Sequence, residues 1–205
     1  MLRLPFTSEA HLTAAVRAVE GAVACHGVVA VPTETFYGLA ADPGDGEAID
    51  RIFELKGRRS DKPLLVVGAS LTQIERLVEI PPVWRNRLVD AWPGPVTVVL
   101  PSSARLAATG GGRTLAVRVP AHTLLRTLLS VVGPLTATSA NRSGGPALFR
   151  ADDVAAALGP GLNVLLDGGS TPGGTPSTLV DLTGSPARLL RAGSWQPPAA
   201  WGVSR

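Results

Sequence analysis

The sequence predicts a mixed α/β fold in which helices flank a twisted, mixed β-sheet. Hydrophobic residues make up 45% of the 205 residues and charged residues 17%, a composition typical of a compact globular protein. Short runs of β-branched and aliphatic residues recur along the chain, as expected of buried strands. Helical spacing of apolar residues separates the early runs, whereas the later runs follow one another closely. This order favours a sheet with both parallel and antiparallel strands.

The helices are predicted from apolar spacing and from capping patterns. One face of the first helix carries five apolar residues: Leu12, Ala15, Val16, Val19 and Val23. Thr7 or Ser8 is its expected N-cap. The second helix covers residues 47–55, and Ser70 with Gln73 three positions later forms a capping-box pattern that begins another. Further helices are expected at residues 84–91, 123–129 and 152–158.

Strands are predicted where β-branched or aliphatic residues run together between turn-forming residues. They are expected at residues 28–31, 64–67, 96–100, 115–119, 135–138, 164–167, 178–181 and 188–191. Residues 168–176, rich in Gly, Pro, Ser and Thr, could form a linker, but too little chain follows them to build a second core. We therefore expect a mobile loop within one domain of residues 1–195, followed by a loosely ordered tail of residues 196–205.

Composition also restricts the cellular setting and the partners. No apolar run approaches the ~20 residues of a membrane span, and the N-terminus lacks a signal-peptide core, so we expect a cytoplasmic protein without membrane contact. The single cysteine, Cys25, fits a reducing compartment, and neither it nor the three histidines has metal-ligand spacing, so no metal site is predicted. A net charge of +3 with only 4% aromatic residues favours a small phosphate ligand over extended nucleic acid.

Positive charge is concentrated in one segment. The only two lysines, Lys56 and Lys62, lie there together with Arg58 and Arg59. Lysine carries a compact ammonium, whereas arginine carries a planar guanidinium. Because the chain uses arginine everywhere else, the two lysines suggest that these positions need an ammonium. A structural alternative is that Lys56 offsets the dipole at a helix end and Gly57 terminates the helix. That alternative leaves the other cations unexplained, so we expect an anion-binding site.

A second candidate segment, residues 32–39, follows the buried strand predicted at residues 28–31. Thr33, Thr35 and Tyr37 alternate, so in extended chain their hydroxyls would face one side. Ligands in open α/β sheets bind beyond the carboxyl ends of strands, and these hydroxyls suit a carboxylate or an ammonium. The alternative is a turn in which a threonine caps a helix.

A third candidate segment, residues 135–146, runs from a strand into a loop with small hydrogen-bonding side chains. Ser139 and Asn141 would share a side, and Gly144 and Gly145 would let backbone N–H groups approach a phosphate. Taken alone, the segment is more typical of an ordinary turn of Ser, Asn and Gly.

Isolated polar residues in later strands add to these segments. Thr114 and Arg118 share one face of an otherwise apolar strand, although a lone arginine in a strand is usually a solvated edge residue. Nucleotide-binding P-loops and nucleophile elbows are missing from the sequence. Carboxylates such as Glu34 and Asp181 are few and isolated in the candidate segments, which disfavours hydrolysis by paired carboxylates. Cations and hydroxyls without a base suit transfer at phosphorus, where positioning and charge neutralisation dominate.

Together these segments resemble the signature of the YrdC-like threonylcarbamoyl-AMP synthase family, in its short single-domain form. The resemblance rests on residues 32–39, on the triplets Lys56-Gly57-Arg58 and Ser139-Ala140-Asn141, and on a Trp-Pro-Gly-Pro-x-Thr element at residues 92–97, and it extends from about residue 10 to residue 195. The chain departs from the family at two positions: Val67 replaces a common histidine, and Arg59 replaces a common proline.

The resemblance implies a YrdC/RibB-like fold with a positively charged concave cleft. It implies a nucleotidyltransferase, an L-threonylcarbamoyladenylate synthase, that converts L-threonine, bicarbonate or CO2 and ATP into threonylcarbamoyl-AMP and pyrophosphate with Mg²⁺. The product would serve threonylcarbamoyl modification of a tRNA adenosine through downstream transfer proteins, and direct contact with tRNA or double-stranded RNA is a further expectation.

The resemblance also implies roles for individual residues. The expected catalytic residues are Lys56, Arg58, Ser139 and Asn141. The residues implied for L-threonine, with Thr33 and Tyr37 added from their alternation, are Thr33, Thr35, Tyr37, Arg118, Ala137 and Ser177. Those implied for ATP are Arg58, Lys62, Thr114, Ser139, Ala147 and Arg191. A carbamate formed on threonine needs no base to attack the α-phosphate, so we expect Lys56, Arg58 and Mg²⁺ to act by charge neutralisation.

Two alternative functions fit the same sequence. A basic concave face could hold double-stranded RNA or tRNA without synthase activity, with an affinity that falls steeply with salt. A relative could also use the same cleft for a different carbamoyl or adenylyl transfer.

Overall fold

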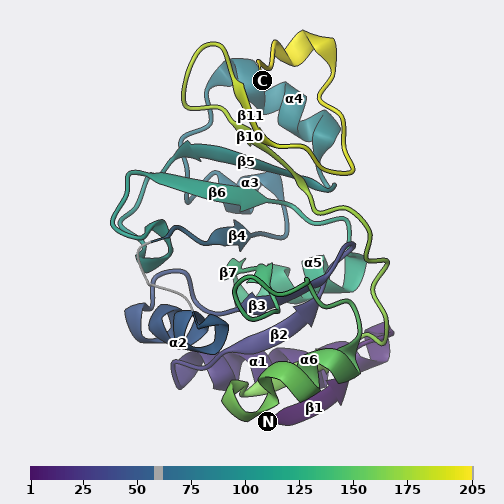
Figure 1. Cartoon of the computed structure of the whole chain (residues 1–205). Helices are drawn as coiled ribbons and strands as arrows, with labels where there is room; N and C mark the ends of the chain where they lie inside the picture. The colour runs from purple at the N-terminus through teal and green to yellow at the C-terminus, as the bar shows by residue number, and fades with distance from the viewer. Residues whose placement is uncertain (58–61, 205) are drawn as a thin grey trace.

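The computed structural model describes residues 1–57 and 62–204, and it confirms the mixed α/β class with helices flanking twisted, mixed β-structure (Figure 1). Arg58 and Arg59 lie outside the described residues. The α-helices are α1 (Leu12–Ala24), α2 (Gly46–Lys56), α3 (Leu71–Ile74), α4 (Pro82–Ala91), α5 (Thr123–Val132) and α6 (Ala151–Leu158). Short 3-10 turns are η1 (Glu9–His11), η2 (Ala107–Thr109), η3 (Gly159–Gly161) and η4 (Ala199–Trp201).

The strands are divided between two sheets. The first has the order β1 (Leu2–Pro5), β9 (Val164–Asp167), β2 (Val29–Pro32), β3 (Tyr37–Ala40) and β8 (Thr138–Ser139). The second has the order β11 (Arg188–Arg191), β10 (Thr178–Asp181), β5 (Val96–Pro101), β6 (Thr114–Arg118), β4 (Leu65–Val67) and β7 (Leu135–Thr136). The strands form two sheets where the sequence predicted one, but the mixed pairing is confirmed in both. In the first sheet β1 is parallel to β9 and β2 is antiparallel to β3; in the second β10 is parallel to β5 and β5 is antiparallel to β6.

Apolar residues on the strands supply two hydrophobic cores. Val29 and Val31 of β2 contribute to one core and Ala30 to the other, because successive side chains of a strand point to opposite faces. Both faces of β2 are therefore buried, which explains its uninterrupted apolar sequence. In β4, Val66 and Val67 belong to different cores in the same way.

The expected strand at residues 135–138 is wrong in one respect that matters for the site. The chain forms β7 in one sheet and β8 in the other, and it crosses between them at Ala137. The Ala137 N–H donates to the Leu65 carbonyl at 2.8 Å, whereas the Ala140 N–H donates to the Tyr37 carbonyl at 2.8 Å. Hydrogen bonding to both sheets thus forces the crossing.

The tail expected to be loosely ordered packs against the domain in the structure. Trp201 is buried, and its ring lies 5.3 Å from that of Trp84 on α4 and 4.8 Å from that of Trp195. The Ser204 backbone also bonds with Ala187 and Leu189. A small apolar cluster over α4 therefore holds residues 195–204.

Helix α2 is fixed at both ends by the capping chemistry that its sequence contains. Asp45 is the N-cap, and its Oδ1 accepts from the Glu47 and Ala48 N–H groups. Gly57 ends the helix with φ of +60°, a left-handed conformation that favours glycine. The capping role that the sequence offered for Gly57 is thus confirmed. None of the helices within residues 1–57 and 62–204 is long and apolar enough to cross a membrane.

The start of α2 gives a testable pH dependence. His26 has a φ of +54°, and its Nδ1 lies 2.6 Å from Asp45 Oδ2, which raises the pKa of His26. At pH values below the unfolded-state pKa of histidine, about 6.5, the raised pKa of His26 contributes its full stabilisation. That stabilisation is lost as the pH rises through the folded-state pKa. We expect His26→Asn to lower the urea midpoint more at about pH 5.5 than at about pH 8.5. Asparagine tolerates the left-handed backbone, so an equal loss at both pH values would contradict the ion pair.

Candidate functional site

Lys56 is the last residue of α2 and is buried, with 4% of its surface exposed. Its ammonium donates hydrogen bonds to the backbone carbonyls of Ser139 at 2.5 Å and Asn141 at 3.0 Å, and to Asn141 Oδ1 at 3.4 Å. The Lys56 carbonyl in turn accepts from the Ser143 N–H at 2.7 Å. Lys56 therefore fixes the loop after β8 to the end of α2.

The structure brings three of the residues predicted to be catalytic together, and we call Lys56, Ser139 and Asn141 the Lys56 cluster. Ser139 Oγ donates to Asn141 Oδ1 at 2.5 Å. Ser139 is exposed, whereas Asn141 is buried and its amide donates to the Gly145 carbonyl at 2.6 Å. The sequence predicted an ammonium that faces the anionic reactants, but the structure places the ammonium inside the loop, because loop oxygens surround it.

The segment between β2 and β3 bends rather than extends. The Thr33 N–H donates to the Phe36 carbonyl at 3.2 Å, and Thr33 Oγ1 donates to the same carbonyl at 2.7 Å. Thr33 Oγ1 accepts from the Thr35 N–H at 3.1 Å and lies 3.2 Å from Thr35 Oγ1. Both threonines are buried. The bend therefore brings their hydroxyls together, whereas the sequence predicted them on one side of an extended chain.

Tyr37 does not share this side, contrary to the sequence-based expectation. Its hydroxyl donates to the Gly169 carbonyl and accepts from the Gly168 N–H, both at 3.0 Å. Burial raises the pKa of Tyr37 to about 12, so the phenol stays protonated near neutral pH. Because residues 33–36 bend, Tyr37 points to the start of the loop at 168–176 and holds it in place.

This contact predicts the effect of replacing Tyr37 by Phe. We expect a loss of about 1–2 kcal/mol in the free energy of unfolding, since the Gly168 N–H and the Gly169 carbonyl both lose a partner. Urea denaturation measures this loss, and limited proteolysis should show faster cleavage within residues 168–176. Unchanged stability together with unchanged cleavage would contradict the role of Tyr37 as a loop anchor.

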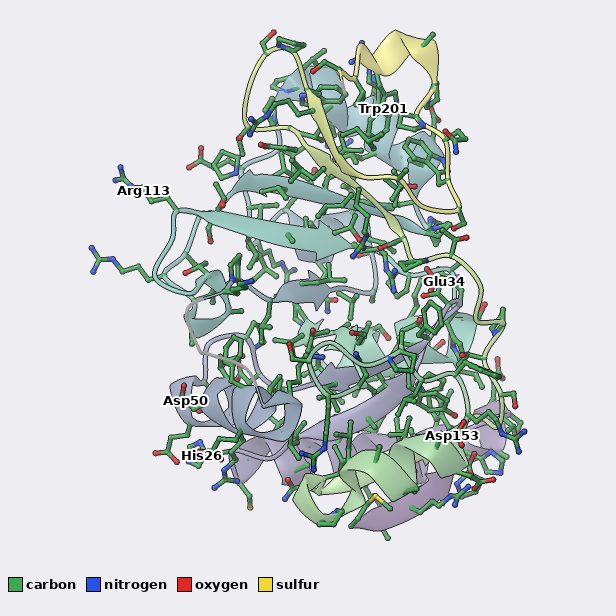
Figure 2. All side chains as sticks on the ribbon, in the orientation of Figure 1. His26, Glu34, Asp50, Arg113, Asp153 and Trp201 are labelled. Carbon is green, nitrogen blue, oxygen red and sulfur yellow. The ribbon has the colours of Figure 1, made fainter. Side chains whose placement is uncertain are left out.

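Arg118 and Glu34 form an ion pair between the two sheets. Arg118 ends β6 and is 4% exposed, and its Nε lies 3.7 Å from Glu34 Oε1. Glu34 belongs to the bend between β2 and β3 (Figure 2). Its side chain is 15% exposed. The sequence suggested that a lone strand arginine could be a solvated edge residue; burial of Arg118 excludes that alternative.

Arg191 and Ser177 lie together at the ends of β11 and β10. Arg191 donates from Nε at 3.1 Å and from Nη2 at 2.9 Å to the Ser177 carbonyl, and from Nη2 to Ser177 Oγ at 3.1 Å. Ser177 Oγ also lies 2.9 Å from Thr97 Oγ1. The structure thus joins a residue predicted for threonine with one predicted for ATP.

We call Glu34, Arg118, Ser177 and Arg191 the Arg118 cluster. The Arg118–Glu34 pair and the Arg191–Ser177 pair are grouped because the charge of Arg191 affects Arg118. Burial lowers the pKa of the Arg118 guanidinium, Glu34 opposes this change, and Arg191 adds to it. Burial also lowers the pKa of Arg191, although a guanidinium stays charged in proteins. The cluster therefore holds two cations and one carboxylate.

Two other predicted residues lie on the strands next to this cluster. Thr114 begins β6 and shares the face of Arg118, about 13 Å away along the strand. Ala137 lies at the crossing between β7 and β8. Strand β4 pairs with β7 on one side and with β6 on the other, where its Val67 lies opposite Arg118. The chain from β7 through Ala137 to β8 therefore leads from the sheet that carries Arg118 to Ser139. A single cleft lined by both clusters stays a prediction.

The last predicted residues have no role that the structure assigns. Lys62 is exposed just before β4, and Ala147 is half-buried in the segment before α6. Arg58 lies outside the described residues. The proposed contacts of these residues with ATP stay predictions.

Sequence reasoning missed three polar residues of these sites. Glu34 was considered only as an isolated carboxylate, although it lies between two selected threonines. Thr171 was considered only as part of a loop, but its Oγ1 donates to the Thr35 carbonyl at 2.8 Å. Thr97, which contacts Ser177, belongs to the Trp-Pro-Gly-Pro-x-Thr element, so a signal for it was present in the sequence.

A pocket of about 580 Å³ lies elsewhere, and its lining includes none of the predicted site residues. Helix α2 contributes Arg51, Glu54 and Leu55 to it, and the region of α6 and η3 contributes Leu158 and Pro160. Within the described part of the chain, no group of three His, Cys, Asp or Glu side chains is placed to hold a metal ion.

Comparisons with known proteins agree on one family. The family model Sua5_yciO_yrdC, described as "Telomere recombination", matches residues 22–193. The threonylcarbamoyl-AMP synthase of Pyrococcus abyssi is 45% identical over 170 residues, covering 81% of this chain and 50% of the relative. The threonylcarbamoyl-AMP synthase of Bacillus subtilis is 40% identical over 173 residues, covering 81% and 49%.

Solved structures give the same result. P. abyssi Sua5 complexed with L-threonine is similar with a TM-score of 0.87 and 39% identity, covering 94% of this chain and 58% of that chain. E. coli YciO is similar in fold, with a TM-score of 0.81 at 21% identity over 95% of this chain and 96% of that chain. The chain spans about half the length of the P. abyssi and B. subtilis relatives.

Proposed function

The chain belongs to the Sua5/YciO/YrdC family, and we propose that it is a threonylcarbamoyl-AMP synthase, which joins L-threonine, bicarbonate or CO2 and ATP to give threonylcarbamoyl-AMP and pyrophosphate. The observation that supports this proposal best is the similarity, over 94% of the chain, to a relative whose structure holds L-threonine. The family resemblance drawn from the motifs is confirmed.

We expect the Arg118 cluster to bind the α-carboxylate of L-threonine. A buried guanidinium recognises a carboxylate in two-pronged geometry, and its interaction is strong because little water screens it. Arg118 is 4% exposed, and the paired hydroxyls of Thr33 and Thr35 adjoin its partner Glu34 in the chain. These residues would hold the carboxylate and the hydroxyl of threonine.

The chemistry of the proposed reaction requires cations at the site. A carbamate on the threonine nitrogen attacks the α-phosphorus of ATP, and pyrophosphate leaves with the electron pair of the broken P–O bond. The attack brings two anions together, and Arg118 and Arg191 would lower this repulsion. Lys56 would act indirectly, by fixing the loop that carries the exposed Ser139 hydroxyl.

Mg²⁺ belongs to the proposal as a companion of the ATP phosphates, which Mg²⁺ commonly binds with only one or two protein carboxylates. The product would be used in threonylcarbamoyl modification of tRNA by separate proteins, in the cytoplasm. These partners follow from the proposed reaction.

The test is pyrophosphate release by the purified chain, with each reactant omitted in turn. We expect release that requires L-threonine, bicarbonate and ATP together, with threonylcarbamoyl-AMP detected by mass spectrometry. Release that ignores threonine would contradict the proposal. Salt-sensitive binding of double-stranded RNA by a chain without this activity would favour the RNA-binding alternative instead.

A further inference from the structure

Glu34 has unused hydrogen-bonding capacity in a buried setting. Within the described residues, no group donates a hydrogen bond to either of its carboxylate oxygens, and both oxygens are buried. The Nε of Arg118, 3.7 Å away, is likewise buried without a hydrogen-bond partner there. Buried charged groups are normally hydrogen-bonded, because a buried charge without hydrogen bonds has lost its hydration and gained nothing in return. A carboxylate and a guanidinium left in this state side by side point to a ligand that satisfies both.

The polar groups in the region of Glu34 make hydrogen bonds to other partners. The Thr33 hydroxyl donates to the Phe36 carbonyl, and Arg191 donates to Ser177. His122, which feels the charge of Glu34, accepts at Nδ1 from the Leu125 N–H, and burial lowers its pKa, so it stays neutral near pH 7. Among the residues that the structure describes, the cation in an ion pair with Glu34 is Arg118.

An α-amino acid matches this pair of charges. Its ammonium and its carboxylate are attached to the same carbon, so one molecule can meet a protein carboxylate and a protein guanidinium that lie 3.7 Å apart. We propose that Glu34 accepts hydrogen bonds from the α-ammonium of the amino-acid substrate while Arg118 holds its carboxylate. This inference rests on the proposed function, and it adds a residue that recognises the free α-ammonium group of the substrate.

The charge of the substrate nitrogen changes during the reaction, and this gives Glu34 a distinct kinetic signature. Glu34 attracts the ammonium, but it repels the carbamate that replaces the ammonium. A group that favours the bound substrate over the later anionic states lowers KM without raising kcat. Glu34→Gln should therefore raise KM for threonine at least about tenfold, as expected for loss of a hydrogen bond to a charged group, and should not lower kcat.

The decisive experiment compares ligands by isothermal titration calorimetry. The probes are L-threonine, (R)-3-hydroxybutyrate, which lacks the ammonium, and L-threoninol, which lacks the carboxylate. The wild type should bind L-threonine at least about tenfold more tightly than (R)-3-hydroxybutyrate. Glu34→Gln should remove most of that ratio without lowering the ratio of L-threonine to L-threoninol, because Arg118 keeps its contact with the carboxylate and no longer shares its charge with Glu34.

The controls separate a binding role from a structural one. Asp181→Asn also converts a buried carboxylate into an amide, outside the Arg118 cluster, and it should leave both ratios unchanged. Glu34→Asp keeps the charge and should recover part of the threonine affinity. If Glu34→Gln fails to fold, the wild-type comparison still decides, since equal binding of L-threonine and (R)-3-hydroxybutyrate overturns the inference.

Two outcomes distinguish this inference from the proposed function. Threonine-dependent pyrophosphate release by the wild type, with the same ligand ratio in Glu34→Gln as in the wild type, overturns the role of Glu34 alone. A wild type that neither binds nor turns over threonine overturns both.

Discussion

Replacing Lys56 by Met should reduce threonine-dependent pyrophosphate release by at least about a hundredfold, the order expected when a reacting group is displaced by about 1 Å. Methionine keeps most of the apolar stem of lysine but has no ammonium to hold the carbonyls of Ser139 and Asn141. The loop then keeps only its backbone bond from Ser143 to the Lys56 carbonyl, and the Ser139 hydroxyl is no longer held in position. The loss of activity thus comes from the position of the loop.

The measurement is steady-state pyrophosphate release, combined with hydrogen exchange over residues 139–145. We expect faster exchange there in Lys56→Met, because the loop opens more readily. Lys56→Arg should also be impaired, since a planar guanidinium does not fit a site built around one ammonium. Arg17→Met removes an exposed cation from α1 and should change neither quantity. Full activity in Lys56→Met would contradict the assignment of the loop to the site.

The elements of the fold could be predicted where the signal is local. Helix α2 follows from its apolar stripe, and Gly57 follows from the need for a left-handed residue at the helix end. Buried strand β2 follows from an uninterrupted apolar run, and the predicted strands at 164–167, 178–181 and 188–191 are confirmed as β9, β10 and β11. In each of these elements, the neighbouring residues in the chain decide the structure.

The parts that could not be predicted depend on contacts between distant segments. The split of residues 135–139 into two strands is set by partners in both sheets, at Leu65 and at Tyr37. The orientation of Tyr37 is set by Gly168 and Gly169, more than a hundred residues away. Alternation along an extended chain predicted a shared side for Tyr37, but the bend at 33–36 cancels that alternation.

The site shows the same division between local and distant information. The types of residue were readable: an ammonium, hydroxyls, and arginines in strands. Their roles were not, because burial decides them. Lys56 was selected as an anion-binding cation, but its ammonium is buried against loop carbonyls. Glu34 was set aside, but it faces Arg118 with unused hydrogen-bonding capacity.

Replacing Arg118 by Met should lower the free energy of unfolding by about 3–5 kcal/mol, since it leaves the Glu34 carboxylate buried without its cation. That is a large part of the ~5–15 kcal/mol that stabilises a typical domain. In the double variant Glu34→Gln and Arg118→Met, no buried charge is left unpaired. We therefore expect the double variant to be more stable than Arg118→Met alone, as urea denaturation would show.

A second arginine–carboxylate pair supplies the control, and the comparison separates burial from distance. Arg188 lies only 2.9 Å from Asp181, but its side chain is 66% exposed. Water screens that pair, so Arg188→Met should cost less than about 1 kcal/mol although its contact is shorter. If Arg118→Met costs no more than Arg188→Met, or if the losses from Glu34→Gln and Arg118→Met add within about 0.5 kcal/mol, the two residues do not act as a buried pair. Arg118→Met is expected to cost more stability than Arg188→Met although the Arg118–Glu34 distance is longer. The reason is that the cost of a charge that has lost its partner depends on how far it is removed from water, not on the former distance between the two groups.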